Sequence, residues 1–137
     1  EVQAGASALA AGTRTAEQMQ ALEDLFAEIE RLDALGPDGA LEQRVDTELE
    51  FYRRITEASD NEYYVEVIGM IEGNIQSNLR SAFLKNAAAS EFGPSILDEH
   101  RAVRDALAIQ DASLARSATR LRFERAAERL AAREDFL

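Results

Sequence analysis

Apolar residues recur along most of this chain at intervals of three and four, the spacing that places side chains on one face of an α-helix. The clearest series runs from Met19 to Leu32, with apolar residues at 22, 25 or 26, and 29 between them. Thr15 precedes this series and Gln18 follows three residues later, which is the form of a helix-capping box. The pattern therefore predicts an amphipathic helix that begins just after Thr15.

Six helical segments are predicted in all. The first is Ala-rich and breaks at Gly12, the fifth has Ser95 as its N-cap, and Asp111 caps the last. We expect the segments at residues 1 to about 11, from 15 to the Gly-Pro-Asp-Gly stop at 36–39, at about 40–58, at about 62–85, from 95 onward, and at about 112–133.

The fourth predicted helix carries apolar and amide side chains together. Asn74 and Asn78 lie one turn apart beside its apolar series, where amides can hydrogen-bond a bound molecule. Solvent or a backbone carbonyl satisfies such amides equally well, so they are the weaker candidates for a binding site. The expected inner side of this helix comprises Val65, Ile68, Ile71 or Glu72, Ile75, Leu79 and Phe83.

The composition agrees with a single all-α domain over residues 1–137, folded as an antiparallel bundle. Apolar residues make up 46% of the 137 positions, and only two Pro and seven Gly interrupt the helical pattern. The length suffices for a real hydrophobic core. Cysteine is absent from the sequence, which excludes disulfides, thiolate metal sites and cysteine nucleophiles.

The formal net charge of −11 bears on the partners of the domain. Nucleic acid and anionic membranes would repel it, so we expect no DNA contact from this chain itself. No apolar run approaches the roughly 20 residues that span a bilayer, and the start lacks a basic signal-peptide region, so we expect a cytoplasmic protein without membrane contact. The sequence begins without Met and in mid-helix, from which we expect that an N-terminal part is missing.

The single histidine lies on an apolar stripe. Ile96, His100, Val103 and Leu107 recur at intervals of four, three and four, so the imidazole shares the core-facing side of the fifth helix. A lone histidine in such a position more often satisfies its hydrogen bonds inside the core than binds a ligand. Other inward polar residues are therefore needed before it indicates a site.

Two further helices supply such residues. On the third helix Glu48 and Tyr52 continue the series of Val45 and Ile55, although Leu49 can take the core position and leave Glu48 in solvent. On the last helix Arg122 lies among alanines at 115, 118 and 126, which leave room for its side chain to reach inward. A buried guanidinium suits bidentate binding of a carboxylate or phosphate. Together with His100, these residues favour a polar ligand pocket in the core.

Catalytic and metal chemistry fit this set poorly. It contains no nucleophile with a base, no carboxylate pair at defined spacing and no phosphate loop, so we do not expect an enzyme. One imidazole and one carboxylate leave a transition metal short of ligands. We therefore expect no cofactor, with Glu48 and His100 as weak candidates if a divalent metal binds.

The order of these motifs resembles the FCD (FadR C-terminal) domain, the C-terminal half of GntR-family transcription regulators. The segment Glu48–Asn61 is similar to the acid-x-x-Phe-His stretch that runs into Ala-Ser-Asp-Asn, and Leu97–Val103 to the Glu-His-Arg-x-Val motif. Residues 13–32, Asp111–Ala115 and Arg122–Ala126 resemble the early Thr-x-x-x-Leu-x-x-Leu helix and the start and end motifs of the last helix. The likeness covers essentially the whole chain except its first helix.

The resemblance implies a bundle that binds a small effector, often a carboxylic acid, and forms a homodimer. DNA contact would come only from a winged-helix domain that this chain lacks. Many members hold a divalent metal through an acid and three histidines. Here only His100 matches a histidine, Glu48 replaces the usual Asp, and Tyr52 and Arg122 stand at or beside the other two positions.

The leading hypothesis is an effector-binding domain in which Arg122 supplies the positive charge of the missing metal. The two alternatives are a metal-dependent sensor of the same family and a helical interaction module that binds no ligand.

Overall fold

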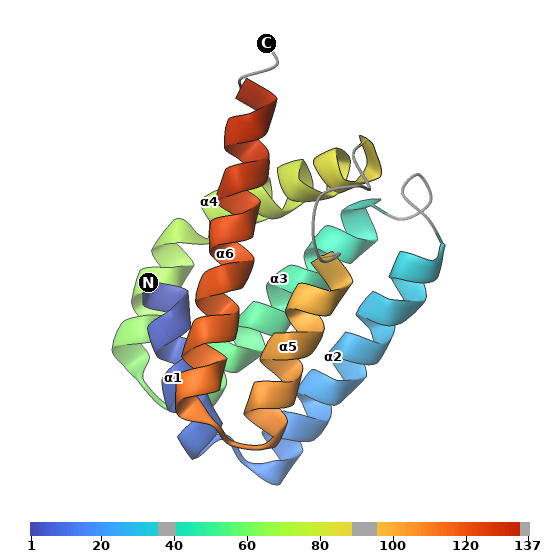
Figure 1. The fold of residues 1–137 in the computed structure, drawn as a ribbon. Helices are drawn as coiled ribbons and strands as arrows, with labels where there is room; N and C mark the ends of the chain where they lie inside the picture. The colour runs from blue at the N-terminus through green and yellow to red at the C-terminus, as the bar shows by residue number, and fades with distance from the viewer. Residues whose placement is uncertain (36–40, 89–95, 135–137) are drawn as a thin grey trace.

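A computed structural model describes residues 1–35, 41–88 and 96–134, without the side chains at 75, 78, 79, 82–88 and 129–134. These residues form helices and no strands, which confirms the predicted all-α bundle (Figure 1). The helices are α1 (Val2–Thr13), α2 (Ala16–Ala34), α3 (Leu41–Ala58), α4 (Glu62–Ala88), α5 (Ile96–Ala108) and α6 (Ala112–Glu134).

Two predicted caps are present in the structure. The Thr15 hydroxyl accepts a hydrogen bond from the backbone N–H of Gln18 at 3.0 Å, and the Gln18 side chain accepts one from the backbone N–H of Thr15 at 2.9 Å. Asp111 accepts a hydrogen bond from the backbone N–H of Leu114 at 2.9 Å, at the start of α6. Both caps satisfy N–H groups that the first turn of a helix leaves without partners. The predicted N-cap Ser95 lies outside the described residues.

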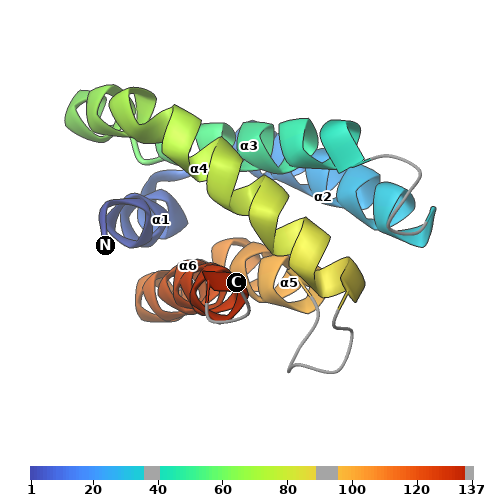
Figure 2. The same cartoon turned by 90° about the horizontal axis from the view of Figure 1, so that it is seen from above.

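Two details of the helices differ from the expectation. Gly12 does not break α1, which continues to Thr13 and ends where Arg14 becomes extended. On α4, Ile68 is buried as predicted, but Val65 and Ile71 are 45% and 36% exposed. In Figures 1 and 2, α4 crosses the bundle obliquely, so only part of its apolar series meets α3 and α6. The predicted inner positions Ile75, Leu79 and Phe83 lie outside the described side chains.

Neighbouring helices bury most of α1. Figure 2 shows α1 between the α3 side and the α6 side of the bundle, and α1 contacts α3, α4, α5 and α6. Eight of its residues are buried, mostly alanine. Small side chains let neighbouring helices approach closely, and at Gly5 an added Cβ would lie 2.6 Å from the Tyr64 hydroxyl. The Ala-rich composition of this segment therefore allows its close packing between neighbouring helices.

The hydrophobic core surrounds the polar residues of interest. A cluster of buried residues joins α1, α2, α3, α5 and α6, and it includes Phe26, Phe51, Tyr52 and Val103. Met19, Leu22, Phe26, Ile29 and Leu32 of α2 are all buried, as the sequence predicts. Elements far apart in the chain thus hold α3, α5 and α6 in fixed positions around a buried polar cluster.

Candidate functional site

Four of the six predicted site residues meet in the interior. Glu48 and Tyr52 come from α3, His100 from α5 and Arg122 from α6, and their side chains are at most 1% exposed. Glu48 and Leu49 are both buried, so Glu48 does not reach solvent. We call these four residues the polar cluster. Each is inward because apolar neighbours at helical spacing turn that face of its helix to the core.

A chain of hydrogen bonds runs through the imidazole of His100. The Tyr52 hydroxyl lies 2.8 Å from Nδ1, and the Glu48 carboxylate oxygen Oε2 lies 2.7 Å from Nε2. Aromatic rings surround the imidazole, with ring centroids 5.5 Å away at Tyr52 and 6.2 Å away at Phe51. Both ring nitrogens therefore have partners in a surrounding that water does not reach.

Burial largely sets the protonation states of the residues in this hydrogen-bonded chain. It lowers the pKa of His100, and Arg122 acts in the same direction, which outweighs the Glu48 carboxylate. Burial also raises the pKa of Tyr52, so the phenol stays protonated. For Glu48, burial favours the neutral form, but His100 and the guanidinium groups of Arg122 and Arg44 together lower its pKa. The consistent arrangement is a neutral imidazole that accepts from Tyr52 at Nδ1 and donates from Nε2–H to ionised Glu48.

Arg122 is the member of the cluster whose hydrogen bonds are incomplete. Its Nε lies 3.2 Å from Nε2 of His100, which cannot accept from Arg122 while it donates to Glu48. Its Nη2 lies 3.9 Å from the Glu48 carboxylate and its Nη1 lies 3.8 Å from the Glu99 carboxylate, both beyond hydrogen-bond distance. Among the described residues, neither Nη atom has a hydrogen-bond partner. The fully buried guanidinium thus has more N–H donors than the surrounding residues have acceptors within hydrogen-bond distance.

Sequence reasoning missed two charged residues beside the cluster. Arg44 donates from Nε to Glu48 at 3.3 Å and also pairs with Asp33 of α2. Glu99 is 5% exposed and precedes His100 on α5. The signals were present but weak: Arg44 lies four residues before Glu48, and Glu99 lies three residues after the apolar Ile96. Such spacings are common on solvated helix faces as well.

The two predicted amides do not join this cluster in the described structure. Asn74 is exposed on α4, and the side chain of Asn78 lies outside the described residues. Among the described side chains, those of α3, α5 and α6 form the site.

The donor set of the cluster does not suit a divalent metal. Besides Glu48 and His100 it offers a phenol that stays protonated and a guanidinium, and the guanidinium lies 3.2 Å from the Nε2 that would bind the ion. Its positive charge would oppose a cation at that nitrogen. Within the described ranges, no group of three or more His, Cys, Asp or Glu side chains could hold a metal ion.

Comparison with known families decides the identity of this fold. The sequence model of the FCD domain matches residues 1–133. The chain belongs to the FCD domain family. FCD domains are the effector-binding domains of GntR-family transcription regulators, a family of regulators rather than enzymes. The comparison with curated proteins finds no match, and among the helices that the structure describes, none could cross a bilayer.

Proposed function

We propose that this FCD domain is the ligand-binding and dimerisation domain of a cytoplasmic GntR/FadR-type bacterial transcription regulator, and that Arg122 binds a small carboxylate-type metabolite. The observation that carries the proposal is the fully buried guanidinium of Arg122, whose Nη1 and Nη2 have no hydrogen-bond partner among the described residues. In the complete regulator a separate winged-helix domain would contact DNA, since the acidic charge of this domain opposes such contact.

A carboxylate is the ligand group that best completes this arrangement. A guanidinium presents two parallel N–H donors that match the two oxygens of a carboxylate, and such charge-assisted pairs are strong in a water-excluded site. Leaving a buried donor unpaired costs about 1–3 kcal/mol, so an acceptor at Nη1 and Nη2 is favoured. Tyr52 and His100 lie next to Arg122 and offer further polar contacts to the ligand.

The neighbouring acids limit the charge of the ligand. Glu48 and Glu99 flank the guanidinium at 3.9 Å and 3.8 Å. A second carboxylate on the ligand would meet these acids at short range, where like charges repel strongly. A monocarboxylate is therefore favoured over a dicarboxylate of similar size.

Binding would move the helices that form the cluster. The four side chains are closed to solvent, so a ligand enters only when α3, α5 and α6 separate locally. A ligand that prefers the opened arrangement shifts the population toward it. That shift is how effector binding would change the geometry of an attached DNA-binding domain.

Isothermal titration calorimetry with a panel of mono-, di- and tricarboxylates tests this proposal. The conservative Arg122→Lys change keeps the charge but loses the bidentate hydrogen bonding, so the affinity for the carboxylate should fall by about 10- to 100-fold. The control Arg101→Lys changes an arginine of α5 that is 38% exposed and lies outside the polar cluster, so it should leave affinity unchanged. Thermal melts confirm that each variant is folded.

Three outcomes would contradict the proposal. No acid binding to the wild-type domain would favour a module that binds no ligand. Equal affinity of the wild type and Arg122→Lys would remove Arg122 from the site. Stoichiometric metal in protein purified without chelators would instead favour a metal-dependent sensor.

A further inference from the structure

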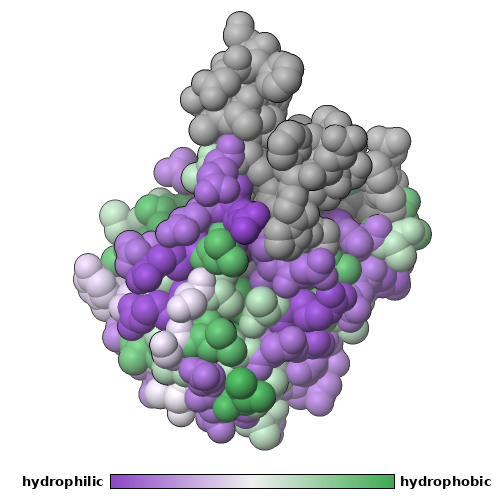
Figure 3. Space-filling model, viewed as in Figure 1, coloured by the Kyte–Doolittle hydropathy of each residue, from purple (hydrophilic) through white to green (hydrophobic). Residues whose placement is uncertain are grey.

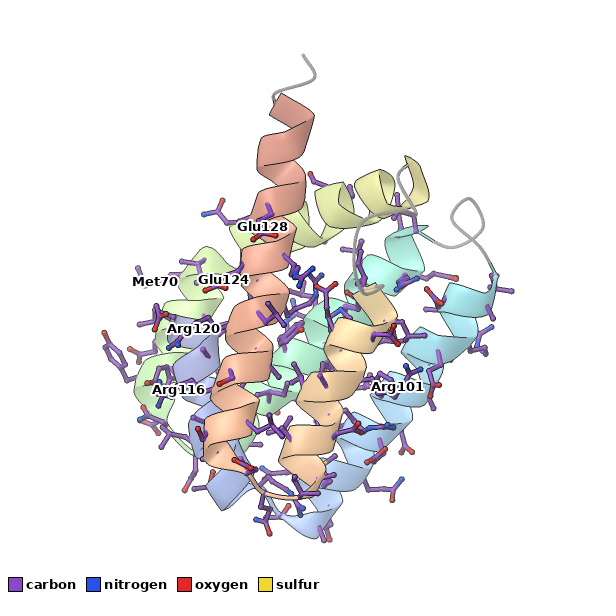
Figure 4. All side chains as sticks on the ribbon, viewed as in Figure 1. Met70, Arg101, Arg116, Arg120, Glu124 and Glu128 are labelled. Atoms are coloured by element: carbon purple, nitrogen blue, oxygen red, sulfur yellow. The ribbon has the colours of Figure 1, made fainter. Side chains whose placement is uncertain are left out.

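The outer side of α6 carries a row of charges with an unusual order. Arg116, Arg120, Glu124 and Glu128 follow one another at intervals of four, so they form one ridge of the helix about 18 Å long. Figure 4 shows the four side chains in this order along one edge of α6, with Met70 of α4 on the same side. The ridge is thus positive toward the N-terminal end of the helix and negative toward its C-terminal end.

Within the described part of the chain, the acidic half of this ridge has no ion-pair partner. Arg120 pairs with Glu1 at 2.9 Å, with side chains that are 41% and 76% exposed, so solvent screens this contact. Neither Glu124 nor Glu128 forms an ion pair with any residue that the structure describes, and the same holds for Arg116. In an isolated helix, arginine N-terminal to glutamate is the less favourable order for pairing at a spacing of four.

The ridge complements a second copy of itself. When two α6 helices lie antiparallel, position 116 of one copy faces 128 of the other, and position 120 faces 124, because both pairs are equidistant from position 122. Each arginine then faces a glutamate of the partner, and the two-fold axis makes four such pairs. A surface that is complementary to itself in this way is the requirement for an isologous interface.

Exposed apolar side chains lie beside the ridge. Leu121 is 44% exposed and lies on the flank of the ridge at the height of its midpoint, where it can contact the partner helix. Leu114 on α6 and Met70 on α4 are 46% and 84% exposed. In Figure 3, apolar patches interrupt the hydrophilic surface on the face where α6 runs. Apolar side chains next to the charged pairs would add buried apolar area to the interface.

The overall charge also favours α6 as the contact. Two chains of net charge −11 repel one another, so association is least opposed at the least acidic surface. The sequence of α6 contains six arginines and three glutamates, in contrast to the acidic remainder of the chain.

From these observations we infer that two copies of this domain associate through the outer face of α6, antiparallel and with the two-fold axis near position 122. This inference rests on the dimerisation part of the proposed function and names the surface that performs it. Arg122 lies on the inner face of the same helix. A ligand that shifts α6 would therefore move the dimer axis as well.

Charge reversal with complementation tests the interface. Arg120→Glu and Glu124→Arg each replace two of the four attractive pairs with repulsive ones, so each variant alone should dimerise at least about tenfold more weakly. An equimolar mixture of the two variants forms heterodimers in which all four pairs are attractive again. We therefore expect sedimentation velocity of the mixture to show dimerisation close to that of the wild type.

Matched controls separate this pairing from changes in net charge. Arg101→Glu on α5 and Glu17→Arg on α2 change the charge by the same amount away from α6 and should leave dimerisation nearly unchanged. A wild type that stays monomeric would overturn both the dimerisation proposal and this interface. A wild-type dimer that resists both reversals would overturn the α6 surface alone, and failure of the mixture to recover would overturn the antiparallel register. Carboxylate binding is measured separately and does not depend on these outcomes.

Discussion

Mild acid should destabilise this domain through one residue, His100. The sequence contains a single histidine, so no other imidazole titrates as the pH falls from about 7 to about 5. In the unfolded chain His100 has a pKa near 6.5, whereas burial and the nearby Arg122 lower its pKa in the folded protein. The unfolded state therefore binds a proton that the folded state resists, and the free energy of unfolding falls as the pH drops below about 6.5.

The size of this loss of stability follows from one bound proton. A difference of one bound proton changes the free energy of unfolding by about 1.4 kcal/mol for each pH unit. For a domain of this size, that corresponds to a fall in Tm of roughly 3–5 °C per unit. The lowered pKa of Glu48 acts in the same direction but only below its unfolded value of 4.5, so the interval between pH 7 and 5 isolates His100.

Urea denaturation at a series of pH values measures this slope. The His100→Gln variant should be less stable throughout, and its stability should depend little on pH in the same interval. Tyr52→Phe removes the hydroxyl at Nδ1 but leaves the imidazole buried, so it should keep the slope. A wild type whose stability is flat between pH 7 and 5, or an equal slope in His100→Gln, would refute this account of the cluster.

Two further predictions concern the interior. Arg122→Met removes a cation beside buried Glu48 and should lower the free energy of unfolding by about 3–5 kcal/mol. When Glu48→Gln is added in the same chain, the total loss should be smaller than the sum of the two single losses. Additive losses in this double-mutant cycle would show that the two charges do not interact. Gly5→Ala would place a Cβ 2.6 Å from the Tyr64 hydroxyl and should lower the free energy of unfolding by about 1–3 kcal/mol, measured by urea denaturation. Adding Tyr64→Phe should recover part of this loss. Gly12→Ala has open space around it and should be neutral or stabilising.

Sequence patterns were sufficient for the parts of this structure that depend on local chemistry. The capping box at Thr15 needs only residues three positions apart, and the buried stripe of α2 needs only helical periodicity. The inward positions of Tyr52, His100 and Arg122 follow from their apolar neighbours on the same helix, whereas the pattern left Glu48 between the core and solvent. These features are visible because the side chains involved lie within one or two helical turns of one another.

The exposed residues of α4 show where this reasoning ends. Periodicity placed Val65 and Ile71 on the inner side with Ile68, yet only Ile68 is buried, because α4 crosses its neighbours at an oblique angle. A hydrophobic stripe indicates which face of a helix is apolar, and it does not indicate how far another helix covers that face. The burial of α1 by four other helices depends on the same tertiary arrangement.

The polar cluster combines both kinds of information. The sequence by itself placed Tyr52, His100 and Arg122 on inward faces of three helices, left Glu48 between the core and solvent, and showed the resemblance to FCD domains. Only the tertiary structure decided which atoms meet: that Glu48 rather than solvent is the partner of Nε2, and that the guanidinium of Arg122 lies between two carboxylates with its Nη donors unpaired. Those distances depend on how α3, α5 and α6 pack across more than fifty residues of sequence, which no local pattern encodes.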